Sequence, residues 1–248
     1  MSVALSSSQS SSNHQWLQAE RWDQFPGLVH SFSSRLEDQS AVWSQIHTRG
    51  MTLRTLRQVH GDEILVIKKH SCLQEQPEAD GMITAETGIL LGIATADCVP
   101  VLIIAPQQRL VAALHAGWRG TLKGIGVRAV ERFSTEWNVD PASLWVAFGP
   151  AIGGCCYEVG ADIGKAMSQR WGSDAGEAWQ PHGQKGFLDL RMINFAQVER
   201  AGVPREQIQF VGPCTFCAAQ RFASYRREGN SARRQLSVIG WDGSSPPR

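Results

Sequence analysis

Three short segments of the chain carry side chains that could bind a metal ion or take part in catalysis. Zinc accepts imidazole nitrogen and thiolate sulfur, at about 2.0–2.1 Å and about 2.3 Å, and catalytic zinc sites use three protein ligands and leave a fourth position open. We therefore take His60, Cys98 and His115 as candidate metal ligands and catalytic residues. They lie in the segments Gln58-Val59-His60-Gly61, Thr95-Ala96-Asp97-Cys98 and His115-Ala116-Gly117-Trp118-Arg119-Gly120.

The spacing of these residues leaves two other interpretations open. One cysteine and two separate histidines do not form a compact metal motif such as HExxH. Cys98 could therefore be a small buried apolar residue and each histidine a structural hydrogen-bond donor. In the second alternative the chain is a metal-free hydrolase or amidase, with Cys98 as the nucleophile and His115 or His60 as its base.

Short apolar runs around these segments predict the strands that would position them. Runs of this length, broken by small or turn residues, are typical of buried strands. We predict strands over 64–67, 89–94, 99–104, 110–114, 143–148, 208–212 and 235–240, and helices over 121–137, 158–171 and 191–202. Because the strands occur in runs rather than alternating strictly with helices, the sequence predicts an α+β fold.

The candidate ligands fall where these elements end. Cys98 lies between two predicted strands and His115 follows another, so their side chains can converge on one cleft. Gly117 and Gly120 would let the backbone approach a ligand closely. The free amides at the start of the predicted helix would face an anion.

Composition and charge limit the domain organisation and the partners. Residues 1–14 are polar and serine-rich and predict a disordered tail, and no linker or repeat divides 15–248, which we predict to be a single domain. The chain has 24 Lys plus Arg and 23 Asp plus Glu, a net charge of +1, which favours neither nucleic acid nor a membrane surface as partner. No signal peptide or apolar span is recognisable, so we expect a cytoplasmic protein with reduced thiols.

Four further cysteines give a weaker signal. Cys155 and Cys156 are adjacent, which places them poorly for binding one ion together. Cys214 and Cys217 form a CxxC motif, but no second CxxC with the spacing of a zinc site follows. We therefore interpret these four residues as buried thiols.

Several motifs together resemble the YfiH-like family, which is also called the laccase-domain or multicopper polyphenol oxidase family. The motifs are QVHG at 58–61, TADCVP at 95–100, HAGWRG at 115–120, GP at 149–150 with YEVG at 157–160, and CT at 214–215 with SYRREG at 224–229. The resemblance covers about 30–240. It implies a mixed-sheet sandwich flanked by helices and related to the catalytic domain of cytotoxic necrotizing factor toxins.

The resemblance also implies an activity and a cofactor. It implies a zinc site built by His60, Cys98 and His115, and phosphorolysis of adenosine, inosine and methylthioadenosine to the free base and (methylthio)ribose 1-phosphate. Adenosine deamination is implied as well, since zinc can lower the pKa of bound water from 15.7 toward about 7. The expected partners are a purine nucleoside and phosphate, and the expected assembly is a monomer or a homodimer.

Arginine and acidic side chains are candidates for the remaining roles. Arg35 closes the motif HSFSSR at 30–35 and is our candidate for phosphate, because a guanidinium binds phosphate in a bidentate manner; a surface salt bridge is the alternative. A departure follows it, since LEDQS at 36–40 replaces the family's glycine-rich stretch. Arg119 and Arg226 are rival anion binders, and Tyr157, just before the predicted helix at 158–171, is a candidate for substrate binding.

Two aspartates could support the metal ligands. Asp97 adjoins Cys98 and is a candidate to orient an imidazole ligand or to carry a proton, although strand alternation could equally turn it away. Asp80, in the sequence EADG at 78–81, fits an ordinary turn residue equally well.

Two further functions stay open beside the zinc enzyme and the thiol hydrolase. A copper-dependent polyphenol oxidase follows from the family's older label, but the chain has seven histidines and no His-x-His pair for coupled coppers. A blue-copper site fits His₂Cys formally, yet no methionine lies near the candidate ligands in the sequence. The resemblance also allows a non-catalytic peptidoglycan-editing factor, because some family members are linked to peptidoglycan composition.

Overall fold

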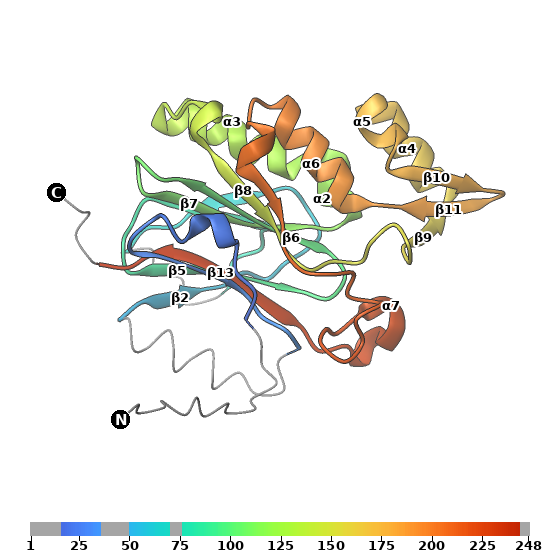
Figure 1. The fold of residues 1–248 in the computed structure, drawn as a ribbon, viewed down its shortest axis with the longest axis horizontal. Helices are drawn as coiled ribbons and strands as arrows, with labels where there is room; N and C mark the ends of the chain where they lie inside the picture. Colours follow the sequence, from blue (N-terminus) through green and yellow to red (C-terminus); the bar gives the residue numbers. More distant parts are fainter. Residues whose placement is uncertain (1–15, 36–49, 70–75, 244–248) are drawn as a thin grey trace, which may run out of the picture.

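The computed structural model describes residues 16–35, 50–69 and 76–243, and Figure 1 shows them as three layers. A helical layer lies against one face of a six-stranded sheet, and a four-stranded sheet lies against the other face. The predicted tail at 1–14 and the segment at 36–40 lie outside the described residues. The arrangement confirms the predicted α+β fold and its mixed-sheet sandwich.

The six-stranded sheet forms the middle layer and carries most of the site. Both central strands, β6 and β7, are buried along their whole length because the sheet is covered on both faces. They pair in antiparallel fashion, and this register places His115 opposite Pro100. The strand order is β12 (Ile208–Phe210), β8 (Trp145–Phe148), β6 (Val99–Ala105), β7 (Leu110–Ala116), β4 (Gly81–Thr84) and β3 (Ile64–Val66).

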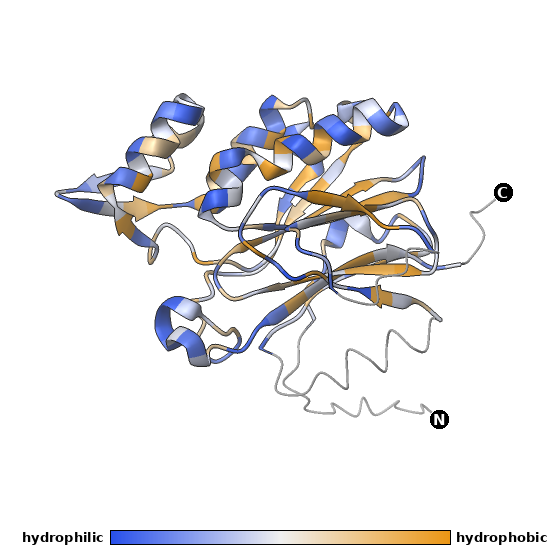
Figure 2. Ribbon diagram, turned by 180° about the vertical axis from the view of Figure 1, so that it is seen from behind, coloured by the Kyte–Doolittle hydropathy of each residue, from blue (hydrophilic) through white to orange (hydrophobic). Residues whose placement is uncertain are grey.

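The four-stranded sheet closes the second side of the sandwich. Its order is β1 (Leu28–Phe32), β13 (Gln235–Trp241), β5 (Ile89–Thr95) and β2 (Thr52–Arg54). Buried side chains from both sheets, among them Leu91, Leu102 and Ile239, form one apolar cluster between them. Figure 2 shows hydrophobic residues gathered along the strands of both sheets. Since apolar burial drives such packing, this layer fixes the β5–β6 turn that bears Cys98.

The helical layer differs from the prediction at Gly124. In place of one helix over 121–137, α2 (Trp118–Lys123) and α3 (Ile125–Trp137) meet at this glycine, which has a φ of 76°. A Cβ at Gly124 would lie 2.8 Å from the ring of Trp171, so the break leaves room for that side chain. α6 (Leu190–Arg200) packs beside them, close to its predicted position.

A second correction concerns the predicted helix at 158–171. Its first residues form strand β9 (Glu158–Gly160), and α4 begins only at Ala161 (Ala161–Trp171). β9 pairs with β11 (Lys185–Leu188), which pairs with β10 (Trp179–His182). The local sequence does not predict this pairing, because α4 and β10 lie between β9 and β11 in the chain. The other α-helices of the described residues are α5 (Ser173–Gly176) and α7 (Tyr225–Glu228), and four short 3-10 helices are η1 (Glu20–Trp22), η2 (Pro141–Ser143), η3 (Arg205–Gln207) and η4 (Gly229–Ser231).

None of the helices in the described part of the chain is long and apolar enough to cross a lipid bilayer.

Candidate metal site and its cleft

The structure brings His60, Cys98 and His115 together. Each offers one ligand atom, and these three atoms lie within 4.8 Å of one another. His60 lies on the turn before β3, Cys98 between β5 and β6, and His115 on β7. Zinc bonds of about 2.0–2.3 Å need donors about 3.3–3.8 Å apart in a tetrahedral arrangement, so small side-chain rotations would suffice.

A buried carboxylate, that of Asp80, organises two of the three donors. Its Oδ1 lies 2.7 Å from Nδ1 of His115 and accepts the N–H of His60 at 2.9 Å. Its Oδ2 accepts the N–H of Gly61 at 2.5 Å and that of Val59 at 3.2 Å. A Nδ1–H held by a carboxylate leaves Nε2 of His115 free to bind a metal. The sequence offered no local signal for this role, since Asp80 fits a turn equally well.

Backbone conformation contributes to the placement of the ligands. His60 has a φ of 59° and Asp97, next to Cys98, a φ of 85°, which are uncommon values for residues other than glycine. Such strained positions persist only where surrounding contacts hold them, and they cluster at functional sites. Gln58 provides one such contact, because its side-chain amide pairs with both backbone groups of Ala94 on β5, at 2.8 and 2.9 Å.

The glycines of HAGWRG allow the backbone at the start of α2 to lie close to the candidate metal ligands, and the predicted approach to a bound ligand stays a prediction. A Cβ at Gly117 would lie 3.1 Å from Sγ of Cys98 and 3.2 Å from the ring of His60. A Cβ at Gly120 would lie 2.9 Å from the carbonyl oxygen of Gly61. Glycine at both positions therefore lets the start of α2 lie directly against two of the donors.

The electrostatics of the three donors favour a thiolate. Burial alone would raise the pKa of Cys98, but hydrogen bonds and charge from His115 and His60 lower it to about 6. Burial alone would lower the pKa of His115, but Asp80 and Cys98 raise it to about 9. A thiolate with two imidazoles is a donor set that zinc prefers. On binding, the cation would replace the proton on Nε2 of His115, while Nδ1 keeps its proton toward Asp80. The residues present therefore fit this metal.

The donors line a cleft of about 600 Å³, a volume typical of small-molecule sites. Its wall combines backbone from the β5–β6 turn with aromatic and cationic side chains from α2, α7 and the segment before β9. Besides the three donors, its side chains include Gln58, Asp97, Trp118, Arg119, Ile152, Tyr157, Leu190, Tyr225, Arg226 and Arg234.

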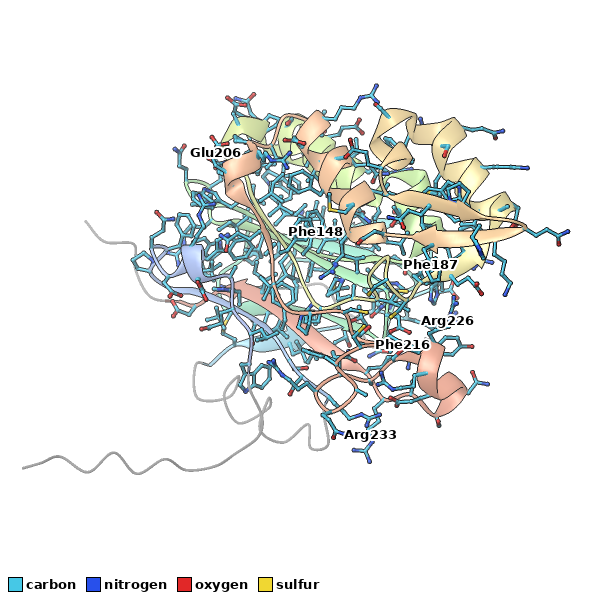
Figure 3. All side chains as sticks on the ribbon, turned by 45° about the vertical axis from the view of Figure 1, so that its right-hand side comes forward. Phe148, Phe187, Glu206, Phe216, Arg226 and Arg233 are labelled. Carbon is cyan, nitrogen blue, oxygen red and sulfur yellow. The ribbon has the colours of Figure 1, made fainter. Side chains whose placement is uncertain are left out.

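The three predicted anion binders have different surroundings. The guanidinium of Arg119 lies 4.4 Å from the centre of the Trp118 ring and has no ion-pair partner among the described residues. Arg226 extends from α7 toward β9, donates to the carbonyl oxygen of Glu158 at 2.6 Å and lies over the Tyr157 ring (Figure 3). Arg35 forms an ion pair with Glu228 and does not line the cleft, which favours the salt-bridge alternative for this residue.

The carboxylate of Asp97 has a different role from the predicted one. It accepts hydrogen bonds from the hydroxyls of Thr215, at 2.6 Å, and Ser224, at 2.9 Å, and from the N–H of Arg226 at 2.7 Å. The prediction that it orients an imidazole is therefore wrong, because Asp80 makes that contact. Asp97 instead connects Thr215 and the start of α7 to the β5–β6 turn. A role of Asp97 in proton transfer stays a prediction.

The fold and this site define a mixed-sheet sandwich with a His₂Cys cluster in a cleft. The model of a family described as multi-copper polyphenol oxidoreductase laccase matches residues 35–242. The chain belongs to this family, as its motifs predict.

The names of individual relatives are more specific than the description of the family. A purine nucleoside phosphorylase, YlmD, of Geobacillus stearothermophilus is 36% identical over 191 residues, which are 74% of this chain and 70% of the relative. A purine nucleoside phosphorylase of Deinococcus radiodurans is 37% identical, over 75% of this chain and 68% of the relative. The adenosine deaminase RL5, from an unknown prokaryote, is 35% identical, over 74% and 72%.

Solved structures show the same fold. The crystal structure of YlmD from Geobacillus stearothermophilus superposes with a TM-score of 0.81 at 28% identity, over 94% of this chain and 98% of that one. The Bacillus licheniformis protein YfiH superposes with a TM-score of 0.80 at 25% identity, over 92% and 96%. The predicted YfiH-like architecture is thus confirmed.

Replacing Asp80 tests its control of the donors. We expect Asp80→Asn to weaken zinc binding about 10–100-fold, as for other groups that orient metal ligands, because a neutral amide holds the His115 ring less firmly. Competition with a chromophoric chelator measures the affinity. Asp62→Asn is the matched control, since this surface aspartate pairs only with Lys123 and Arg128 among the described residues. Equal affinity of Asp80→Asn and wild type would contradict the role.

The reactivity of Cys98 in metal-free protein should follow its pKa. The thiolate forms above its folded-state pKa of about 6 and is lost below it, so iodoacetamide modification of Cys98 should have its midpoint near that pH. In His115→Ala the midpoint should move up toward 9.0, the ordinary value of the thiol. Peptide mass spectrometry separates Cys98 from the other cysteines. A midpoint near 9.0 in both proteins would show that no such pair exists.

Proposed function

We propose that this chain is a zinc-dependent enzyme that cleaves purine nucleosides by phosphorolysis and deaminates adenosine. The observation that carries this proposal is the His₂Cys cluster in the wall of a cleft large enough for a nucleoside. Relatives named purine nucleoside phosphorylase and adenosine deaminase support the same chemistry.

His60, Cys98 and His115 would hold the zinc ion, with Asp80 fixing the imidazole of His115. Zinc in such a site supplies a Lewis acid and lowers the pKa of a bound water toward about 7. The cluster lies at the surface of the cleft, since His60 is exposed while His115 is buried. A metal ion held by these residues would therefore be accessible from the cleft.

Arg119 is our revised candidate for phosphate. Its guanidinium is held against Trp118 by a cation–π contact but keeps its N–H groups available among the described residues. A guanidinium can bind phosphate through two parallel hydrogen bonds. Arg226, in contrast, already donates to Glu158 and lies over Tyr157, so we assign it to shaping the wall.

Tyr157 is suited to donate a hydrogen bond to substrate. Burial and the neighbouring Cys98 thiolate raise its pKa to about 12, so its hydroxyl keeps its proton at neutral pH. A protonated phenol in the cleft can donate to a ribose or purine acceptor, or to charge that develops on the leaving base.

A metal-free thiol hydrolase is the second candidate, because the Cys98–His115 pair also suits a nucleophile and its base. Its thiolate exists at neutral pH and His115 can supply a proton. The two functions differ in their response to chelation. Activity that survives complete zinc removal but is abolished by alkylation of Cys98 would favour the hydrolase.

The decisive experiment uses untagged protein. We expect release of free base from adenosine, inosine and methylthioadenosine only when phosphate is present, and inosine with ammonia from adenosine. Cys98→Ala and His115→Ala should each lose one zinc per chain and about 10²-fold or more in turnover, because several kcal/mol of metal stabilisation disappear. His182→Ala, on β10 and outside the cleft, is the matched control. Zinc-loaded protein that turns over no purine nucleoside would refute the proposal.

Arg119→Ala tests the phosphate site separately. We expect the KM for phosphate to rise about 10–100-fold, because hydrogen bonds to a charged group contribute about 1.5–3 kcal/mol, while deamination keeps its rate. Arg21→Ala is the matched control, since Arg21 lies over the Trp145 ring in the same type of contact away from the cleft. An equal loss of both activities in Arg119→Ala would reject a specific role in phosphate binding.

A further inference from the structure

Four cysteines form a second cluster outside the cleft. The Sγ atoms of Cys155, Cys156, Cys214 and Cys217 all lie within 4.8 Å of one another. Sγ of Cys217 lies 3.3 Å from that of Cys156 and 3.7 Å from that of Cys155. Phe216, labelled in Figure 3, lies between Cys214 and Cys217 in the sequence and marks the place of the CxxC segment in the fold.

The interpretation of these residues as buried thiols is wrong for three of them. Cys155 and Cys217 are exposed and Cys156 is half-buried, and only Cys214 is buried. Adjacency does not keep Cys155 and Cys156 apart either. The N–H groups of Cys156 and Tyr157 both donate to the carbonyl oxygen of Gly153, and this tight turn directs both thiols toward Cys217.

The sulfur positions match a tetrahedral ion better than a disulfide. A zinc ion bonded at about 2.3 Å to four thiolates separates their sulfur atoms by about 3.8 Å. The separations of 3.3 and 3.7 Å from Sγ of Cys217 lie close to this value, whereas a disulfide needs about 2.05 Å. An iron–sulfur cluster would need wider spacing, since several iron and sulfide atoms must fit between the thiolates.

Backbone amides already point at one of the sulfur atoms. The N–H of Gly153 donates to Sγ of Cys214 at 3.3 Å. The amides of Cys217 and Phe216 lie close to the same sulfur atom. Amide donors to the first sulfur of a CxxC turn stabilise its anionic form, which is the form that binds a metal.

A cation lies close enough to offset part of the charge of such a site. Four thiolates around a divalent ion carry a net charge of −2. A Cβ at Gly153 would lie 3.4 Å from a guanidinium nitrogen of Arg191 and 3.5 Å from Sγ of Cys155, so the two groups flank the same point. The guanidinium of Arg191 is therefore placed to favour an anionic complex.

We propose that Cys155, Cys156, Cys214 and Cys217 bind a structural zinc ion as a tetrathiolate site, independent of the His₂Cys cluster. Structural zinc sites are closed by four protein ligands and stabilise the fold directly. The ion would join the turn before β9 to the CxxC turn, two segments separated by about 60 residues of sequence.

The position of this site connects it to the cleft. Cys156 directly precedes Tyr157, which lines the cleft. Cys214 pairs with Ala151 in a β-bridge and precedes Thr215, which donates to Asp97. The zinc ion would therefore help to position both Tyr157 in the cleft and Thr215, which donates to Asp97.

Metal counting in three full-length proteins tests the proposal. Untagged wild type, Cys98→Ala and the double variant Cys214→Ser/Cys217→Ser are purified under reducing conditions without chelator, and zinc and iron are measured by mass spectrometry. We expect two zinc ions per chain in wild type, one in Cys98→Ala and one in the double variant. If the cleft binds no zinc, the counts become one in wild type, one in Cys98→Ala and none in the double variant. Failure of the zinc site in the cleft can therefore be told apart from failure of the tetrathiolate site.

Cobalt substitution gives a readout that does not depend on folding of the double variant. Cobalt added to metal-free Cys98→Ala should give the intense visible absorption of a tetrahedral tetrathiolate complex, which zinc then displaces. Cys98→Ala that retains no zinc and gives no such absorption would overturn the proposal. So would iron in place of zinc, or a thiol count showing that Cys217 is in a disulfide under reducing conditions.

Discussion

The hydrogen bonds of the Asp80 carboxylate are the constraint on which the site depends. This side chain is fully buried and ionised, which would be unfavourable without partners. Its partners are the imidazole of His115 and three consecutive amides of the turn that bears His60. This single buried charge therefore sets the tautomer of His115 and the backbone conformation of the turn that bears His60.

A second buried carboxylate has the matching role on the other side of the cleft. Asp97 holds Thr215, Ser224 and the amide of Arg226, so the start of α7 is tied to the turn that carries Cys98. The cleft is thus assembled from segments far apart in sequence, which are held together by two buried carboxylates.

The family description names copper and polyphenols, whereas the donors in the cleft are two imidazoles and one thiolate. Coupled copper centres need several histidines close together, and the sequence has seven in total with no His-x-His pair. In the described residues His60 and His115 are the histidines of the cluster, with His30 and His182 elsewhere. The donor set in the cleft therefore does not provide the group of histidines that a coupled copper centre needs.

The sequence alone predicted the class of fold and, through its motifs, the grouping of His60, Cys98 and His115, because strand patterns and short motifs are local features. Tertiary structure decided which carboxylate supports the donors, since the roles of Asp80 and Asp97 depend on neighbours 35 and more than 100 residues away. It likewise paired Arg35 with Glu228 and left Arg119 facing the cleft. The tertiary structure also brought Cys155 and Cys156 together with Cys214 and Cys217. The local spacing could not predict this contact, because the two pairs lie on turns that are far apart in the sequence.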